Sequence, residues 1–571
     1  MTKKSYRKIG TMNSTSKRRV VLEQKSSSKL AILITLIGIA FLLFGLVSLA
    51  LAASEPQTEN LLKFNRGLNS QSSPFSLSTD ELTEANNVNY VIDGSVARRN
   101  GNVAVGGAVA AARITALYDF IQSDGAQDLV AVAGTVQAKQ DSVDGTWDTI
   151  TGGPALTTNI LRDCVVFENE LLCTDDTSTD GTWQLTAGGA TATDWNTNFA
   201  VGSIEKARFV TVFQNYVVLA RVEDNGGTDY NSRFYWSTLG DADTWSATDF
   251  IDVDTETETG GIGGMEVLGQ YLYIFKERGG VYRVRFTGDN SIPFTVEKTA
   301  CENGTNAGFT IKNFNNVLFY YSQIRPGIYA FDGNECIEIS SKIEPTIEGY
   351  DESISTEFVA GIHHPRNQYW LGMRSAGSSE NDRIVVYDID NNAFSIFTGI
   401  EAAFMASVRY SNVTQMFTGD YSGYALQQDT GNTDTLDGTA GTTIDSSIRT
   451  AWLPLGQPVM TKSIMHTMVY HSLAGNYNLN FAYAYDFESA DQFMTAFPVY
   501  AGGAVWDTDV WDAFTWASKG GGALTRVDMR GSGAFIRYHI YNNENVASWE
   551  LYGITPIFRY EKIHRPTSLI E

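Results

Sequence analysis

The chain has 571 residues with 52 Gly and 12 Pro, aromatic residues make up 12% of it, and its formal charge is −24. This length exceeds what one compact core holds, so we expect several domains, or a repeat array with an appendage. The acidic balance argues against specific nucleic-acid binding, because surfaces that bind phosphate backbones are basic. Short apolar runs rich in Val, Thr and aromatic residues are typical of an all-β protein.

The N-terminus differs from the rest of the chain in charge and hydropathy. Residues 1–29 form a basic lead, and residues 30–53 carry no formal charge. This second stretch is long enough to cross a bilayer as one hydrophobic helix, and it ends in the small-residue pattern of a signal-peptidase site. We therefore expect either a cleaved signal peptide or a transmembrane anchor. Both place the body of the protein on the far side of a membrane.

Four cysteines suit an exported chain with up to two disulfide bonds. Cys164 and Cys173 flank a predicted hairpin and are placed to bridge its two strands, whereas Cys301 and Cys336 are placed to close a longer loop. The alternative is four buried thiols, because spacing alone does not prove pairing. The absence of paired CxxC motifs from the sequence argues against a zinc site.

Residues 54–112 are predicted to form an extended segment of short pieces separated by turns. Within it, the Asp93-Gly94 pair predicts a hairpin turn between VNYVI and SVARR.

A repeating strand pattern occupies residues 113–430. SVDGTW (142–147) returns 36 residues later as STDGTW (178–183), with five of six positions identical, which indicates a repeat array. Five later stretches, such as Phe209–Val222, share one plan of an apolar strand, a polar turn and an aromatic strand. The stretch Arg233–Phe286 contains the end of one such unit and the start of the next. Units of this kind predict a β-propeller of about seven blades.

The pattern changes after residues 431–447, which read as a low-complexity linker. Alternation over nine or more residues, as in GAFIRYHIYNN, predicts a β-sandwich over residues 448–571. Trp506, Trp511 and Trp516 lie five residues apart with acids between them. They are interpreted either as packing residues of a loop or as an aromatic patch for a partner or a sugar.

The candidate metal site is a run of alternating acids, Asp252, Asp254, Glu256 and Glu258. Alternating carboxylates on one strand face give the dense oxygen surface that calcium prefers, and the alternative is a solvated acidic loop. The run lacks the glycine and terminal glutamate of an EF-hand loop. The sequence has no phosphate-binding glycine motif and no paired-histidine metal motif, so we expect no other cofactor.

Several motifs together resemble a family of tailed-phage virion proteins. They are Gly67-Leu68-Asn69, Asn86-Asn87, Asp93-Gly94 and Arg98-Arg99-Asn100-Gly101, followed by RFYWSTLGDADTW, DFIDV, LYIFKERGGVYRV, WLPLGQPVMTKSI, the spaced tryptophans and Arg565-Pro566. Over residues 61–566 the chain is similar to propeller-bearing proteins of the tail or head-to-tail region, including the nozzle and tail-tubular class of short-tailed phages. The resemblance implies a ring-forming structural subunit without a catalytic centre, docked on neighbouring tail or connector proteins. The hydrophobic segment at residues 30–53 departs from that pattern, because virion parts are normally assembled in the cytoplasm.

Catalysis has little support in the sequence. SVDGTW is close to the turn boxes of propeller sialidases, where the box is a structural turn, and no pair of acids stands out as the two carboxylates that a glycosidase needs. We therefore expect a non-enzymatic virion protein of the tail that assembles as a homo-oligomeric ring. The alternatives are an exported or membrane-anchored propeller that binds carbohydrate or protein at the cell surface and, more weakly, an extracellular glycan hydrolase.

Overall fold

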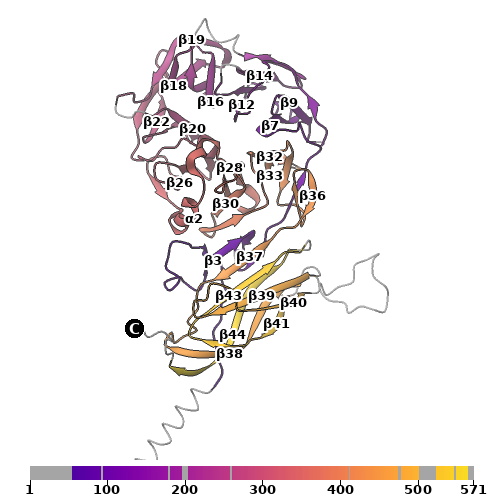
Figure 1. Cartoon of the computed structure of the whole chain (residues 1–571). Helices are drawn as coiled ribbons and strands as arrows, with labels where there is room; N and C mark the ends of the chain where they lie inside the picture. Colours follow the sequence, from indigo (N-terminus) through magenta and orange to yellow (C-terminus); the bar gives the residue numbers. More distant parts are fainter. Residues whose placement is uncertain are drawn as a thin grey trace, which may run out of the picture.

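The computed structural model describes residues 55–563 except residues 92–93, 144, 178–179, 196–203, 225, 257–259, 411, 474–476, 500–521 and 545–547. The described part is built mainly of β-strands, so the prediction of an all-β protein is confirmed. Figure 1 shows a ring of small sheets joined at one side to two longer sheets. The described part of the chain also has short helices, which are η2 (Gly308–Thr310), η3 (Ser341–Ile343), α2 (Glu344–Glu348), η4 (Glu352–Glu357) and η5 (His364–Arg366).

Six separate sheets form blades of a β-propeller (Figure 1). The first two contain β7 (Ile114–Ile121), β8 (Gln127–Ala133), β9 (Val136–Asp141) and β10 (Asp148–Thr149), then β11 (Thr151–Gly152), β12 (Asp163–Phe167), β13 (Glu170–Thr174), β14 (Trp183–Thr186) and β15 (Thr191–Asp194). The third contains β16 (Lys206–Phe213), β17 (Tyr216–Glu223), β18 (Asp229–Thr238) and β19 (Asp241–Asp252). The next two contain β20 (Ile262–Leu268), β21 (Tyr271–Lys276), β22 (Val281–Phe286) and β23 (Phe294–Lys298), then β24 (Lys312–Phe314), β25 (Val317–Ser322), β26 (Gly327–Phe331) and β27 (Cys336–Glu338).

The last blade takes its fourth strand from the N-terminal part of the chain. It contains β32 (Phe404–Tyr410), β33 (Val413–Gly419) and β34 (Ala425–Gln428), and its fourth strand is β6 (Asn102–Ala104). Leu426 is opposite Ala104 in this antiparallel pair. The N-terminal segment therefore closes the propeller.

One four-stranded antiparallel unit belongs to a larger sheet. It contains β28 (Val359–His363), β29 (Gln368–Met373), β30 (Arg383–Asp388) and β31 (Ala393–Phe397). Its first strand packs against β24 on one side and β32 on the other, and β32 in turn packs against β7. The first strands of successive units therefore contact one another around the whole ring, through β7, β12, β16, β20, β24, β28 and β32.

The first hairpin of each blade explains why its two strands can be predicted from the sequence. The two turn residues have positive φ in Glu168-Asn169, Gln214-Asn215 and Asn315-Asn316. Such turns match the twist of the flanking strands, and Asn tolerates the left-handed conformation better than most residues. The predicted apolar strand, polar turn and aromatic strand accordingly fall on the first two strands of their units, as in β16 and β17.

The 36-residue motif repeat does not mark the blade period. SVDGTW lies between β9 and β10, whereas STDGTW runs from the β13–β14 connection into β14, so the two copies occupy different places in their blades. The first strands start 43 to 56 residues apart, at residues 114, 163, 206, 262, 312, 359 and 404. The 36-residue spacing is therefore shorter than the spacing of the units, although the prediction of a repeat array is confirmed.

The remaining strands form two sheets beside the ring. One has the order β4 (Val88–Tyr90), β5 (Val96–Arg98), β44 (Glu550–Ile563), β38 (Met460–Ser472) and β41 (Gly522–Asp528), with β1 (Gln57–Thr58) on β44 and β42 (Ser532–Gly533) on β38. The other continues from β31 through β3 (Glu81–Asn86), β37 (Ser446–Thr450), β43 (Ile536–Asn542), β39 (Tyr477–Tyr485) and β40 (Phe493–Val499), with β2 (Gly67–Leu68) on β3. In the sequence, the hairpin of β35 (Asp434–Leu436) and β36 (Thr439–Thr442) comes after the last blade and before β37.

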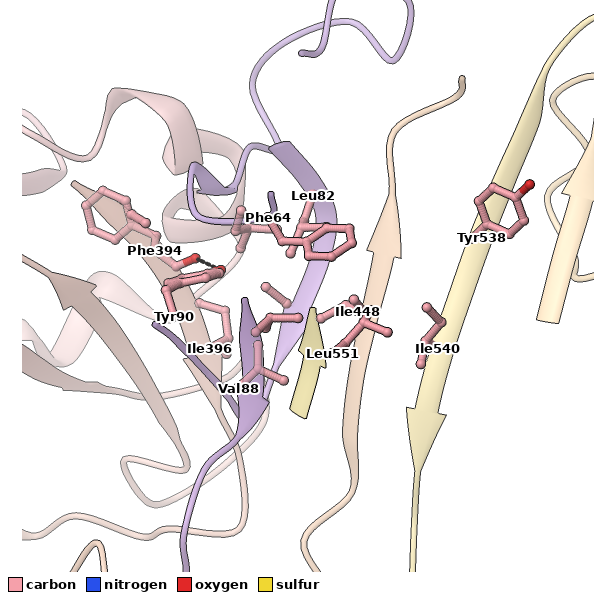
Figure 2. Close-up of a cluster of buried hydrophobic side chains, with 14 of the residues drawn as sticks. Phe64, Leu82, Val88, Tyr90, Phe394, Ile396, Ile448, Tyr538, Ile540 and Leu551 are labelled. Carbon is pink, nitrogen blue, oxygen red and sulfur yellow. Dashed lines mark hydrogen bonds between the residues drawn. The ribbon is translucent and has the colours of Figure 1, made fainter. Parts of the chain in front are cut away.

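Strand β3 joins the ring to these sheets. It pairs with β31 at Asn86 and Ile396 and with β37 along most of its length. Figure 2 shows the apolar side chains gathered around it, from β4, β31, β37, β43 and β44. Within this cluster the buried Tyr90 hydroxyl donates to the Phe394 carbonyl at 2.7 Å.

A buried ion pair reinforces the junction beside β6. Arg99 donates to both carboxylate oxygens of Asp434, at 2.8 and 2.5 Å, and the two side chains are 2% and 1% exposed. Arg99 also donates to the Asn87 side chain at 2.8 Å, and Asn87 donates to the Asp445 carbonyl. Residues of the N-terminal segment thereby hold the chain that leaves the last blade.

We predict that Asp434→Asn lowers the free energy of unfolding by about 3–5 kcal/mol, because it leaves the Arg99 charge buried without its counterion. Asp528→Asn is the matched control, since it breaks the Arg526–Asp528 pair, whose side chains are 60% and 76% exposed. Its expected cost is about 0–1 kcal/mol. Denaturant titration of both variants measures the difference, and equal costs would contradict a structural role for the buried pair.

Close backbone approach at the junction gives a second prediction. A Cβ added at Gly101 would lie 1.9 Å from the Thr433 carbonyl oxygen, so Gly101→Ala should cost about 1–3 kcal/mol through forced backbone shifts. Gly107 has no other group within 4 Å of such a Cβ, and Gly107→Ala should leave the melting temperature unchanged. A melting temperature for Gly101→Ala equal to that of wild type would argue against the packing described here.

Candidate functional site

Four polar side chains gather on the first strands of the propeller, nearest its axis. They are Tyr118 on β7, Asp163 on β12, Glu266 on β20 and Lys312 on β24. Tyr118 donates its hydroxyl hydrogen to Asp163 at 3.1 Å, and the other carboxylate oxygen of Asp163 accepts from the Val210 backbone at 3.0 Å. We call these four residues the axial cluster.

The surroundings of the axial cluster shift the pKa values of its ionisable groups in the direction that favours the neutral forms. Burial raises the pKa of Asp163 to about 6 and that of Glu266 to about 7, while the positive charge of Lys312 acts against both shifts. Burial likewise lowers the pKa of Lys312. All four side chains are half-buried, so water near the axis screens part of the burial cost. Perturbed groups of this kind are typical of binding or proton-transfer sites, although the cluster defines no reaction by itself.

A second polar site lies where the first strands begin. Here a cavity of about 140 Å³ is lined by Arg113, Asn159, Ile160, Leu161, Arg208, Thr356 and Glu357. Glu357 accepts from Arg113 at 2.9 Å and from Arg374 at 3.2 Å. Arg208 pairs with Asp176 at 2.7 Å. We call this site the arginine cavity.

Two larger and more open cavities occur elsewhere. One of about 490 Å³ is lined by Glu277, Arg278, Asn306, Gln323 and Ile324, and Arg221 forms an ion pair with Glu277. The other, about 540 Å³, lies on the longer sheets and is lined by Asn60, Leu62, Tyr470, Ala523, Leu524 and Tyr552. Leu62 and Leu524 are about half exposed there, so its lining is largely apolar.

The acidic run predicted as a calcium site is engaged in protein contacts. Asp252 accepts from Arg233 at 2.7 Å, and Asp254 accepts from the Tyr282 hydroxyl at 2.6 Å. Glu256 is exposed, and Glu258 lies outside the described residues. Among the residues that the structure describes, no three or more His, Cys, Asp or Glu side chains come together in a metal-binding group.

The cysteines form two disulfide bonds. Cys164 and Cys173 are directly opposite each other on β12 and β13 and are joined. Cys301 is joined to Cys336, which ties the chain after β23 to β27 of the next blade. Both bonds therefore act within or between neighbouring blades.

Two predicted features fall outside the described residues. Trp506, Trp511 and Trp516 lie in the stretch 500–521, and the hydrophobic segment 30–53 lies before residue 55. Within the described ranges, no helix is both long enough and apolar enough to span a bilayer.

The axial cluster was not found from the sequence. Glu266 is a single charged residue inside an otherwise apolar first strand, in GMEVLG, whereas Asp163 begins β12 directly after Arg162. This is a usable signal once the first strand of each unit is known, because an isolated charge on an inner strand faces either a neighbouring blade or the axis. The arginine cavity offers no such signal, since its residues come from separate connections, from β16 and from η4.

Comparisons with known proteins give neither a family nor a function. No family model matches the chain, and no curated protein matches it. Similar solved structures include the computationally designed Ika8 protein, with a TM-score of 0.34 and 8% identity over 57% of this chain and 99% of that one. The WD40 beta propeller domain of Doa1 has a TM-score of 0.33 and 6% identity over 58% and 96%. BBS1N in complex with ARL6DN has a TM-score of 0.34 and 9% identity over 58% and 98%. Structural similarity at this level is too low to support an inference, so the propeller assignment depends on the strand order.

The raised pKa of Glu266 predicts a pH-dependent effect of Glu266→Gln. The pKa of about 7 in the folded protein lies above the ordinary value of 4.5. The free energy of unfolding of the wild type therefore falls as the pH rises from 4.5 through 7, because the buried side chain then loses its proton. Between pH 4.5 and pH 8 the free energy of unfolding of the variant should rise by about 1–2 kcal/mol relative to that of the wild type. This is less than the ~1.4 kcal/mol per pKa unit expected for a fully buried group, because water screens the partly exposed side chain.

Denaturant titration across this pH range measures the gain. Glu302→Gln provides a control at an exposed glutamate, for which we expect no comparable trend. A gain that does not change with pH would contradict a buried, titrating Glu266.

Proposed function

We propose that the protein is a structural component of a bacteriophage tail or head-to-tail assembly and acts by self-assembly and docking. The observation that supports this proposal best is the position of the motifs behind the family resemblance. Gly67, Asn87, Arg99 and Gly101 all belong to the junction between the ring and the longer sheets. In Gly67 the φ angle is +73°, and an added Cβ would lie 2.8 Å from the backbone nitrogen of Phe394.

This placement favours an architectural role. These four residues fix how two parts of one chain are joined, and none of them belongs to the axial cluster or the arginine cavity. A subunit that transmits force along a tail needs a rigid connection of this kind, and buried ion pairs and backbone pairing supply it.

The proposal extends to the finer architecture. We count the unit β28–β31 as a seventh blade, because its first strand takes its turn in the circle of first strands. We interpret the two longer sheets as a β-sandwich, because both contribute to one apolar cluster that includes Val469, Phe481, Tyr538 and Phe558. The proposed partners are further copies in a ring and neighbouring tail or connector proteins. In this proposal the chain is not an enzyme.

An exported or membrane-anchored propeller is the second candidate. Two disulfide bonds suit an oxidising compartment, and the predicted membrane segment at residues 30–53 agrees with export. Such a protein would bind carbohydrate or another protein at the cell surface. The glycan hydrolase has weaker support, although Asp163 and Glu266 are the acids on which mutagenesis should start.

Mass spectrometry of purified phage particles tests the preferred function. We expect peptides from residues 55–563 in infectious particles, at a stoichiometry that fits a ring, with major capsid peptides from the same sample as the reference. Their absence from the particles, combined with their presence in host membrane or medium fractions, would overturn the virion assignment. N-terminal sequencing of the recovered protein then separates the export routes, since a start at Ala53 or Ser54 means cleavage of a signal peptide.

A further inference from the structure

We propose that the arginine cavity binds one small oxyanion group, a carboxylate or a phosphate. This inference concerns ligand chemistry and does not depend on the assembly role. The side chain of Arg113 is only 10% exposed. Among the described residues, neither Nε nor Nη2 of Arg113 has a hydrogen-bond partner, although both atoms are shielded from water.

The unsatisfied nitrogens belong to a group of cationic side chains. Nε of Arg208, which also lines the cavity, and Nε of Arg374 likewise have no hydrogen-bond partner within the described part of the chain. Buried guanidinium donors without acceptors are unfavourable, because they have lost water without gaining a protein partner. An anion that enters the cavity and displaces the groups covering these nitrogens would supply the missing acceptors through charge-assisted hydrogen bonds.

The surroundings hold Arg113 in place for such a ligand. Its guanidinium carbon lies 5.2 Å from the centroid of the Tyr421 ring, and its Nη1 atom is already bonded to Glu357. This leaves the Nε and Nη2 side of the fork for another acceptor. Arginine forks match the two oxygens of a carboxylate or phosphate.

Size and composition limit the ligand. The cavity of about 140 Å³ is smaller than the ~300–1,000 Å³ of sites for drug-sized molecules, so we expect one anionic group rather than a sugar chain. Asn159 and Thr356 add polar side chains to the lining, and exposed Asn159 places the cavity next to solvent. The single carboxylate in the lining, Glu357, opposes an incoming anion through its own negative charge, although it occupies a different nitrogen of Arg113.

Isothermal titration of the full-length protein with inorganic phosphate at constant ionic strength tests the site. We expect one saturable site per chain, and Arg113→Gln should weaken binding at least tenfold. Glu357→Gln should strengthen it severalfold, because the opposing negative charge is removed. A merely structural role for Glu357 predicts equal or weaker binding instead. Arg526→Gln, at an arginine 60% exposed on the longer sheets, is the matched control and should bind like wild type.

A second titration distinguishes the two sources of the anion. An acetylated, amidated tetrapeptide with one glutamate stands for the acidic side chain of a docked partner. Tighter binding of this peptide assigns the site to a partner carboxylate, and tighter binding of phosphate assigns it to a free ion. The proposal is overturned if neither probe binds saturably, or if Arg113→Gln, folded by circular dichroism, binds both probes as wild type does. Should Arg113→Gln fail to fold, Arg208→Gln and Glu357→Gln decide the matter, and weaker binding by Glu357→Gln would contradict the site.

Discussion

Backbone pairing between the N-terminal strands and strands late in the chain is the constraint on which the molecule depends. β6 supplies the last strand of a blade, and β3 lies between a strand of the ring and a strand of the longer sheets. Without β6, the last blade would expose a row of unpaired backbone groups at its edge, and sheets protect such edges. Without β3, the β28–β31 unit of the ring would lose the strand that makes it continuous with β37 and the longer sheet beyond it.

Charge is distributed unevenly over this framework. The chain is strongly acidic as a whole, yet arginines concentrate where the first strands begin, and each of Arg113, Arg208 and Arg374 has an acidic partner. On the same first strands, burial shifts the pKa values of Asp163, Glu266 and Lys312 in the direction that favours their neutral forms. The arginines are therefore paired with acids, whereas burial dominates at the two axial acids because they share a single cation, Lys312.

The sequence predicted local structure well and long-range pairing poorly. Apolar strands around turn residues such as Asn315 and Asn316 identify hairpins, because both strands and turn lie within about 15 residues. Nothing local in VAR or NVA shows that β5 pairs with β44 or that β6 joins the last blade, since these partners lie hundreds of residues away. The candidate sites share this difficulty. Tyr118 and Asp163 meet only because β7 and β12 are neighbours in the ring, so their pairing follows from topology.

Closure of the last blade by β6 also determines when the ring can be completed during synthesis. Residues 425–428 of β34 must leave the ribosome before β6 has a partner, so the segment that carries β6 waits while every intervening strand is made. The entropy lost in closing so long a loop grows only slowly with its length, but pairings between distant residues form late and slow folding. The part of the propeller that is translated first is therefore among the last to reach its final place.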